Sequence, residues 1–186
     1  MNWWRETIRM AKENDPAVRN TVELLMTYPG VKALAAHRVS HFLWQRKFYL
    51  LARMNSQLWR FWTGIEIHPG AKIAPGVFID HGMGVVIGET AIIEEGVVLF
   101  HGVTLGGTGN ATGKRHPTVR KNAFISAHSQ ILGPVTIGKD AKVGASAVVT
   151  KDVPNGATVV GVPAKVVKLY GQKTDEKGNV IHDSDL

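Results

Sequence analysis

His81 is the residue in this sequence best suited to move a proton. It stands beside a carboxylate and a glycine in the segment Asp80-His81-Gly82. An unperturbed imidazole titrates at about pH 6.5, so at neutral pH it can take a proton from a hydroxyl group, which is typically worth about 10² to 10⁴ in rate. The chain has no cysteine, which excludes a thiol nucleophile, a disulfide and a thiolate metal site. The sequence therefore favours acid–base chemistry by an imidazole.

A second polar segment spans residues 106–117 and ends in Lys114-Arg115-His116 before Pro117. Its Gly-Gly-Thr-Gly stretch invites comparison with a phosphate-binding loop, but no Gly-Lys-Ser/Thr appears and no helix is expected after it. These glycines instead allow the backbone to approach a reacting carbonyl, and the amide of Gly107 can face a developing oxyanion. We expect this segment to project as a loop.

Both groups of polar residues lie inside a six-residue repeat. A period of six fits neither an α-helix nor an ordinary strand, whereas it fits a triangular coil with one short strand and one corner per hexapeptide. The repeat predicts about five turns of a parallel β-helix over residues 67–154. It shifts by two residues after Val85 and is interrupted by the loop. The repeated aliphatic residues are Ile67, Ile73, Ile79, Val85, Ile87, Ile93, Leu99, Leu105, Val119, Ile125, Ile131, Ile137, Val143 and Val149.

Residues 1–63 have helical spacing of apolar side chains, and we expect an N-terminal helical region there. The predicted helices span residues 3–13, 16–27, 31–45 and 47–62. Asp15-Pro16 is typical of a helix N-cap followed by proline, and Tyr28-Pro29-Gly30 of a break. The β-helical catalytic domain is expected over 64–168, with its loop at 106–117. A polar tail is expected over 169–186, mobile after Tyr170.

The composition is that of a soluble globular protein, with 186 residues of which 44% are hydrophobic. No apolar leader or membrane-spanning segment is expected, so we expect a cytoplasmic protein without a membrane partner. The net charge of +7 indicates an anionic partner, either nucleic acid or a phosphorylated cofactor. The coil has no aromatic stacking platform, which argues against nucleic acid.

Several short segments together carry a resemblance to a known family. They are Asn14-Asp15-Pro16-Ala17, Gly64-Ile65-Glu66-Ile67-His68-Pro69, Ile79-Asp80-His81-Gly82-Met83-Gly84, Val86-Ile87-Gly88-Glu89-Thr90, Gly102-Val103-Thr104-Leu105-Gly106-Gly107-Thr108-Gly109, Lys114-Arg115-His116-Pro117 and Gly161-Val162-Pro163-Ala164. Over residues 14–168 the chain is similar to the serine acetyltransferases, which are hexapeptide-repeat acyltransferases. The resemblance implies a left-handed parallel β-helix, transfer of acetyl from acetyl-CoA to the hydroxyl of L-serine for cysteine biosynthesis, and no metal.

The resemblance also implies roles for individual residues. His81 matches the general base of the family. Glu66 lies fifteen residues earlier, close to one turn of the coil, where a carboxylate can hold the tautomer of the imidazole; many family members have aspartate there. Asp15 and Asp80 match the carboxylates that meet the serine ammonium group, although Asp15 would also serve as a helix cap.

Arg115 and His116 match the pair that meets the serine carboxylate, for which the forked guanidinium of arginine is well shaped. In the family, CoA occupies the groove between neighbouring coils of a trimer. Ala127 and Ala145 match small residues along that groove. The lysines expected to meet CoA phosphates are Lys139 and Lys142, with Lys151 and Lys165 as further candidates.

For partners, the resemblance implies a homotrimer, with pairing of two trimers left open. L-cysteine is expected as a feedback inhibitor because it carries the same ammonium and carboxylate groups as serine. Family members commonly dock a C-terminal isoleucine into cysteine synthase. This chain ends in Leu186, which branches differently, so we expect a weak complex or none.

Three alternatives remain at this stage. One is a zinc carbonic anhydrase of the β-helix class, whose metal is held by three histidines across a trimer interface; the candidate ligands would be His68, His81, His101, His116 and His128. The second is an acetyltransferase for a sugar or xenobiotic acceptor. The third is a hexapeptide scaffold or a basic nucleic-acid binder without enzymatic activity.

Overall fold

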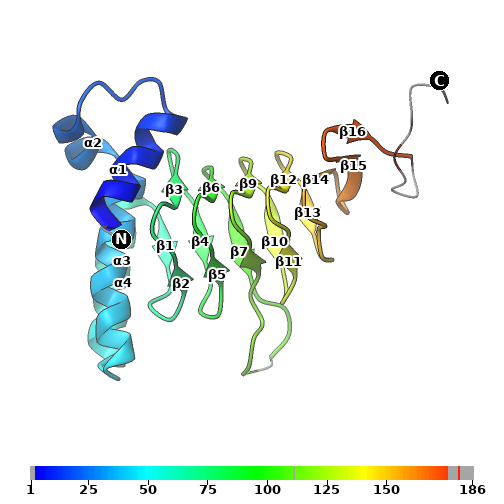
Figure 1. Ribbon diagram of the computed structural model, residues 1–186. Helices are drawn as coiled ribbons and strands as arrows, with labels where there is room; N and C mark the ends of the chain where they lie inside the picture. The colour runs from blue at the N-terminus through cyan, green and yellow to red at the C-terminus, as the bar shows by residue number, and fades with distance from the viewer. Residues whose placement is uncertain (1–2, 111, 176–179, 181–186) are drawn as a thin grey trace.

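Four helices cap one end of a β-helical coil in the computed structural model, which describes residues 3–110, 112–175 and 180. Figure 1 shows the helices stacked at one end and the strands following in successive turns. The helices are α1 (Trp3–Asn14), α2 (Thr21–Thr27), α3 (Pro29–Gln45) and α4 (Tyr49–Thr63). In the described part of the chain, none of the helices combines the length and apolar character needed to cross a membrane.

The prediction of a helix over residues 16–27 was wrong at its start. The helix begins at Thr21, where the side chain of Asn20 accepts the N–H of Glu23 at 2.8 Å as the N-cap. Asp15 does not cap a helix, because residues 16–20 are not helical, although its carboxylate accepts the N–H of Ala17. The predicted break at Pro29 is a one-residue junction, since proline is well tolerated at the first position of α3.

The coil consists of three sheets whose strands are two to five residues long, and the expected left-handed parallel β-helix is confirmed. Sheet A contains β1 (Glu66–Ile67), β4 (Val86–Ile87), β7 (Thr104–Gly106), β10 (Gln130–Leu132) and β13 (Val148–Val149). Sheet B contains β2 (Lys72–Ile73), β5 (Ile92–Ile93), β8 (Thr118–Val119) and β11 (Thr136–Ile137). Sheet C begins with β3 (Phe78–Ile79), β6 (Val98–Leu99), β9 (Phe124–Ile125) and β12 (Lys142–Val143).

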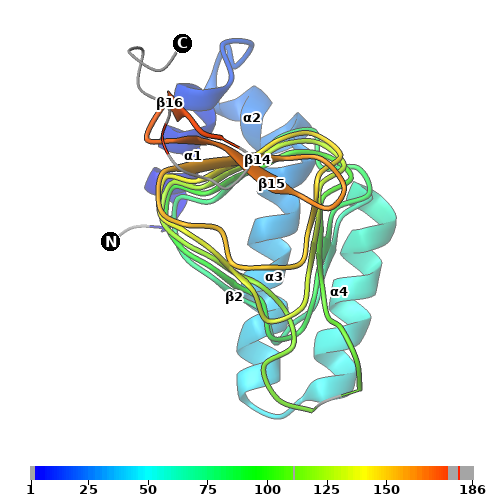
Figure 2. The same cartoon turned by 90° about the vertical axis from the view of Figure 1, so that its right-hand side faces the viewer.

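The register explains the two breaks in the repeat. Val86 pairs with Thr104, so this turn takes eighteen residues, or three hexapeptides. Glu66 pairs with Val86, so the first turn takes twenty, and the two additional residues lie in the corner that holds His81. Thr104 pairs with Gln130 across twenty-six residues because the loop is inserted in that turn. Figure 2, which looks along the coil, shows the triangular section with the loop leaving one corner.

Sheet C continues past the region expected to end the coil. It adds β14 (Ala157–Val160) and then β15 (Lys165–Leu169) and β16 (Gln172–Lys173), which pair antiparallel. The expectation of a mobile segment after Tyr170 was therefore wrong for Gln172 and Lys173, which form β16. Leu186 lies outside the described residues.

Candidate active site

The corner between sheets C and A, residues 80–84, presents His81 to solvent. We call it the His81 corner. His81 has a φ of 58° and Gly82 a φ of 78°, in the left-handed region that side chains rarely adopt. Glycine is required next to the histidine, because a Cβ on Gly82 would lie 2.4 Å from the Cδ1 atom of Ile65. The side chain of His81 is 73% exposed, so the imidazole is directly accessible to a ligand.

Two carboxylates interact electrostatically with His81, one from Asp80 in the corner itself and one from Asp15. The Oδ2 atom of Asp80 lies 3.8 Å from the Nε2 atom of His81, too far for a hydrogen bond but close enough for charge attraction. Asp15 accepts the Tyr28 hydroxyl at 2.5 Å and the N–H of Ala17 at 2.8 Å. The hydrogen bond from Tyr28 is the main reason that the pKa of Asp15 is lowered, and the charge of His81 adds to the effect. Asp15 therefore stays a carboxylate beside the imidazole.

Tyr28 is a site residue that the sequence analysis missed. Its hydrogen bond to Asp15 raises its own pKa to about 12, with the charge of Asp80 contributing. The residue before a proline is restricted to extended backbone, and Tyr28 has a φ of −80° and a ψ of 111° before Pro29. This conformation between α2 and α3 turns the tyrosine back to α1. The only available signal was the Tyr-Pro pair, which was interpreted as a break.

Glu66 lies in β1, and the contact that the structure gives its carboxylate is an ion pair with Arg60. The Nε atom of Arg60 and the Oε2 atom of Glu66 are 3.2 Å apart. In the strand register Glu66 pairs with Val86, not with a residue of the His81 corner. The pairing of Glu66 with His81 stays a prediction.

The corner between sheets A and B holds the second group of predicted residues, and we call residues 88–91 with 115–116 the loop corner. Arg115 forms an ion pair with Glu89, with 2.6 Å between Nη2 and Oε2. His116 is buried against Gly88, where a Cβ would overlap its Cδ2 atom at 1.9 Å. A Cβ on Gly107 would lie 3.1 Å from the Nε2 atom of His116. The structure therefore brings Gly107, Arg115 and His116 together.

The His81 corner and the loop corner do not converge within one chain. They precede and follow β4, and the residues 85–88 alone span about 10 Å at the usual rise of a strand. Burial, followed by the charge of Arg115, lowers the pKa of His116. The loop corner is thus a neutral imidazole beside a guanidinium, whereas the His81 corner carries carboxylates.

The small residues predicted to line a cofactor groove continue the His81 corner along the coil. Ala127 follows β9 and Ala145 follows β12, and the N–H of Ser146 donates to the carbonyl of Ala127 at 2.9 Å. Lys142 lies exposed in β12 of sheet C. Lys139 lies at the other end of that strand, 3.6 Å from the carboxylate of Asp140. Ala127 and Ala145 therefore lie on the same edge of the coil as His81, between sheets C and A, whereas Lys139 lies between sheets B and C.

Three histidines stack in successive turns without forming a metal site. The rings of His81 and His101 have centroids 6.0 Å apart, those of His101 and His128 4.9 Å, and both contacts are edge to face. Among the residues that the structure describes, no three histidine, cysteine or acidic side chains are placed to hold a metal ion.

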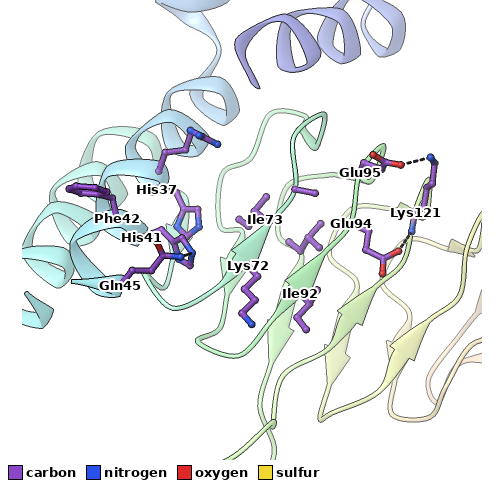
Figure 3. Close-up of a pocket in the computed structure, with 13 residues that line it drawn as sticks. His37, His41, Phe42, Gln45, Lys72, Ile73, Ile92, Glu94, Glu95 and Lys121 are labelled. Carbon is purple, nitrogen blue, oxygen red and sulfur yellow. Dashed lines mark hydrogen bonds and ion pairs between the residues drawn. The ribbon is translucent and has the colours of Figure 1, made fainter. Parts of the chain in front are cut away.

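A groove of about 680 Å³ lies between α3 and sheet B, and no residue of the His81 corner or of the loop corner lines it. Figure 3 shows His37, His41 and Phe42 of α3 on one side and Lys72 and strand residues on the other. The backbone N–H of Lys121 donates to Glu94 at 3.0 Å, and its ammonium group pairs with Glu95. None of the predicted site residues lines this groove.

Known proteins resemble the chain over most of its length. A family described as "Bacterial transferase hexapeptide (six repeats)" matches residues 116–151. The serine acetyltransferase of Bacillus subtilis is 53% identical over 169 residues, which are 91% of this chain and 78% of that protein.

Three solved structures also match. The Neisseria gonorrhoeae serine acetyltransferase in complex with serine is 39% identical with a TM-score of 0.84, and the match covers 87% of this chain and 66% of that one. A serine acetyltransferase in complex with cysteine is 40% identical with a TM-score of 0.87, covering 89% and 69%. Another in complex with CoA is 40% identical with a TM-score of 0.84, covering 89% and 68%.

The coil of six-residue turns, interrupted by a loop and carrying an exposed imidazole at one corner, defines a transferase of the hexapeptide-repeat class. The serine acetyltransferase of Bacillus subtilis is identical to this chain at about half of the positions, over nine-tenths of its length, and this similarity identifies one family within the class. The chain belongs to the serine acetyltransferase family.

Tyr28→Phe tests the hydrogen bond that holds Asp15 charged. Without the hydroxyl, the pKa of Asp15 should rise toward its ordinary value of 3.8, because the donor favours the carboxylate form. The stability from a lowered pKa is present above pH 3.8 and lost as the pH falls through the folded-state pKa. Tyr28→Phe should therefore lower the free energy of unfolding more at pH 6 than at pH 2.

The measurement is a carboxyl carbon NMR titration of Asp15, with urea unfolding at the two pH values. Tyr49→Phe, at an exposed tyrosine of α4, is the matched control and should leave the Asp15 titration unchanged. An Asp15 titration that does not move in Tyr28→Phe would remove the tyrosine from this role.

Proposed function

We propose that this protein transfers the acetyl group of acetyl-CoA to the hydroxyl of L-serine, with His81 as the general base. The observation that carries the proposal is the exposed imidazole of His81, which lies 3.8 Å from the carboxylate of Asp80 and whose charge acts on the carboxylate of Asp15. This arrangement suits an acceptor with a hydroxyl and an ammonium group, which favours an amino acid over a sugar. The structures of related serine acetyltransferases in complex with serine and with CoA support it.

In the proposed reaction, neutral His81 removes the hydroxyl proton as the serine oxygen attacks the thioester carbonyl carbon. The amide of Gly107 stabilises the charge that develops on the carbonyl oxygen. The bond from carbon to sulfur then breaks, and the imidazolium returns the proton to the sulfur of CoA. The products are O-acetyl-L-serine and CoA, and His81 ends in its starting state.

The separation of the two corners supports a site shared between chains. One serine cannot reach Asp15 and Asp80 before β4 together with Arg115 and His116 after it, because serine is much shorter than that span. A closed trimer brings the His81 corner of one chain against the loop corner of the next. We therefore propose a homotrimer with three equivalent sites, each made by two chains.

Acetyl-CoA is proposed to lie along the line of small residues below His81. Ala127 and Ala145 leave room for the pantetheine arm on that corner, and Lys142 is exposed nearby for the phosphates. The position of Lys139 at the far end of β12 favours a phosphate contact from a neighbouring chain. The cytoplasmic location and the weakness of any complex through Leu186 stay predictions.

His81→Ala should reduce turnover at least about a hundredfold while acetyl-CoA still binds, because the proton acceptor is lost and the corner needs no imidazole to pack. Glu66→Gln should cost less, since it keeps the shape and removes only the charge. Thiol release from acetyl-CoA with L-serine measures both.

Asn122→Ala is the matched control for alanine at a left-handed position, since Asn122 has a φ of 57° at a different corner. It should keep full activity. Near-normal turnover by folded His81→Ala protein would exclude this histidine as the base.

L-cysteine is proposed to inhibit by occupying the serine site, as the related complex with cysteine suggests. It offers the same ammonium and carboxylate to the same residues, so inhibition should compete with serine. Initial rates are measured at several L-cysteine concentrations while either L-serine or acetyl-CoA is varied. These rates show with which substrate cysteine competes. Competition with acetyl-CoA alone, or no effect at millimolar cysteine, would contradict this.

A further inference from the structure

We propose that Thr90 is a positioning residue that fixes the tautomer of His116, so that a ring N–H is presented to the carboxylate of the acceptor. The inference rests on the proposed function, because it assigns a cause to the placement of the carboxylate-binding pair. Thr90 follows β4 in the segment Gly88-Glu89-Thr90 and touches the loop twenty-five residues further along the chain.

The side chain of Thr90 makes three hydrogen bonds with the returning end of the loop, and the backbone N–H of Thr90 makes a fourth. Its Oγ1 atom accepts the N–H of Arg115 at 3.0 Å and the N–H of His116 at 3.1 Å. The same Oγ1 atom is 2.9 Å from the Nδ1 atom of His116. The backbone N–H of Thr90 donates to that Nδ1 atom at 3.2 Å.

Counting hydrogens assigns the tautomer. A hydroxyl has one donor and two acceptor positions, and the two backbone N–H groups use both acceptor positions. The remaining contact, to Nδ1 of His116, must therefore be a donation from the hydroxyl. The backbone N–H of Thr90 also donates to Nδ1 of His116, and an N–H group can only donate. Nδ1 is thus an acceptor without a proton, and the neutral ring carries its hydrogen on Nε2.

The Nε2 side of the ring faces the start of the loop. A Cβ on Gly107 would lie 3.1 Å from Nε2, so this nitrogen borders the backbone that is proposed to meet the substrate. An N–H there can donate to a carboxylate, whereas the opposite tautomer would direct a lone pair at it. The tautomer therefore favours acceptors that carry a free carboxylate.

Neighbouring contacts anchor the same segment. The Nζ atom of Lys114 donates to the carbonyl of Thr90 at 2.7 Å and to that of Pro117 at 3.1 Å. Glu89 holds the guanidinium of Arg115. The loop thus returns onto Glu89 and Thr90, and the hydroxyl of Thr90 contacts both the backbone and the ring of His116.

The test compares Thr90→Val, which keeps the shape and removes the hydroxyl, with Thr90→Ser, which keeps the hydroxyl. Thr90→Val should raise the KM for L-serine about tenfold, with kcat and the KM for acetyl-CoA within about twofold of wild type. Thr90→Ser should restore the KM for L-serine. Thr150→Val, at an exposed threonine beyond β13, is the matched control and should change neither constant.

Nitrogen NMR of ¹⁵N-histidine-labelled protein reads the tautomer directly and needs no activity. In the wild type, His116 should show a protonated Nε2 and an unprotonated Nδ1, and Thr90→Val should shift the ring toward a mixture. A proton on Nδ1 in the wild type overturns the inference, whether or not Thr90→Val folds. So does an unchanged KM for L-serine in Thr90→Val. If the tautomer depends on Thr90 but L-serine is not acetylated, the proposed function fails and the assignment of the tautomer stands.

Discussion

Every turn of the coil must return its aliphatic side chains to the same three lines, and the rest of the structure depends on this constraint. Ile67, Ile87 and Leu105 stack in sheet A with at most 4% exposure. Burial of each such side chain contributes roughly 1.5–3 kcal/mol, so the wall tolerates few departures. Additional residues are accommodated at corners, where the aliphatic lines are not broken. The two breaks in the repeat are therefore also the two places that carry polar chemistry.

The division of the site follows from where those breaks fall. Two additional residues in the first turn form the corner with His81, and the inserted loop returns onto the corner with His116. β4 lies between them, so one chain holds a carboxylate half and a cationic half that face different directions. Each half is organised by a residue remote in sequence, Tyr28 for Asp15 and Thr90 for His116. A symmetric assembly is the simplest way to bring complementary halves together.

The fold and much of the site could be predicted from the sequence because their signals are local. A six-residue period predicts the coil directly, and it placed Ile125 and Ile131 in the core, where both are fully buried. The family motifs pointed to His81, Arg115 and His116. The start of α2 was missed because Asp15-Pro16 has the local pattern of a cap, whereas the carboxylate bonds to a tyrosine thirteen residues later.

Contacts across long stretches of chain account for the other omissions. Thr90 reaches its partners only once the coil has closed a turn, and no local pattern around it indicates a hydrogen-bonding centre. Residues 165–168 were expected in the β-helical domain, but their antiparallel pairing as β15 was not predicted, because Lys165 and Lys168 make the segment polar. Its backbone nevertheless pairs with β14 along the edge of sheet C, so its order comes from hydrogen bonds of the main chain.

A site shared between two chains is tested most directly by mixing two variants, each deficient in one half. His81→Ala lacks the proton acceptor, and Arg115→Ala lacks the guanidinium of the loop corner. When the two are co-expressed in equal amounts, an interface is complete when the Arg115→Ala chain supplies His81 and the His81→Ala chain supplies Arg115. Random assembly of trimers should then restore about a quarter of the wild-type turnover. Mixed protein no more active than the two variants alone would contradict a site made by two chains.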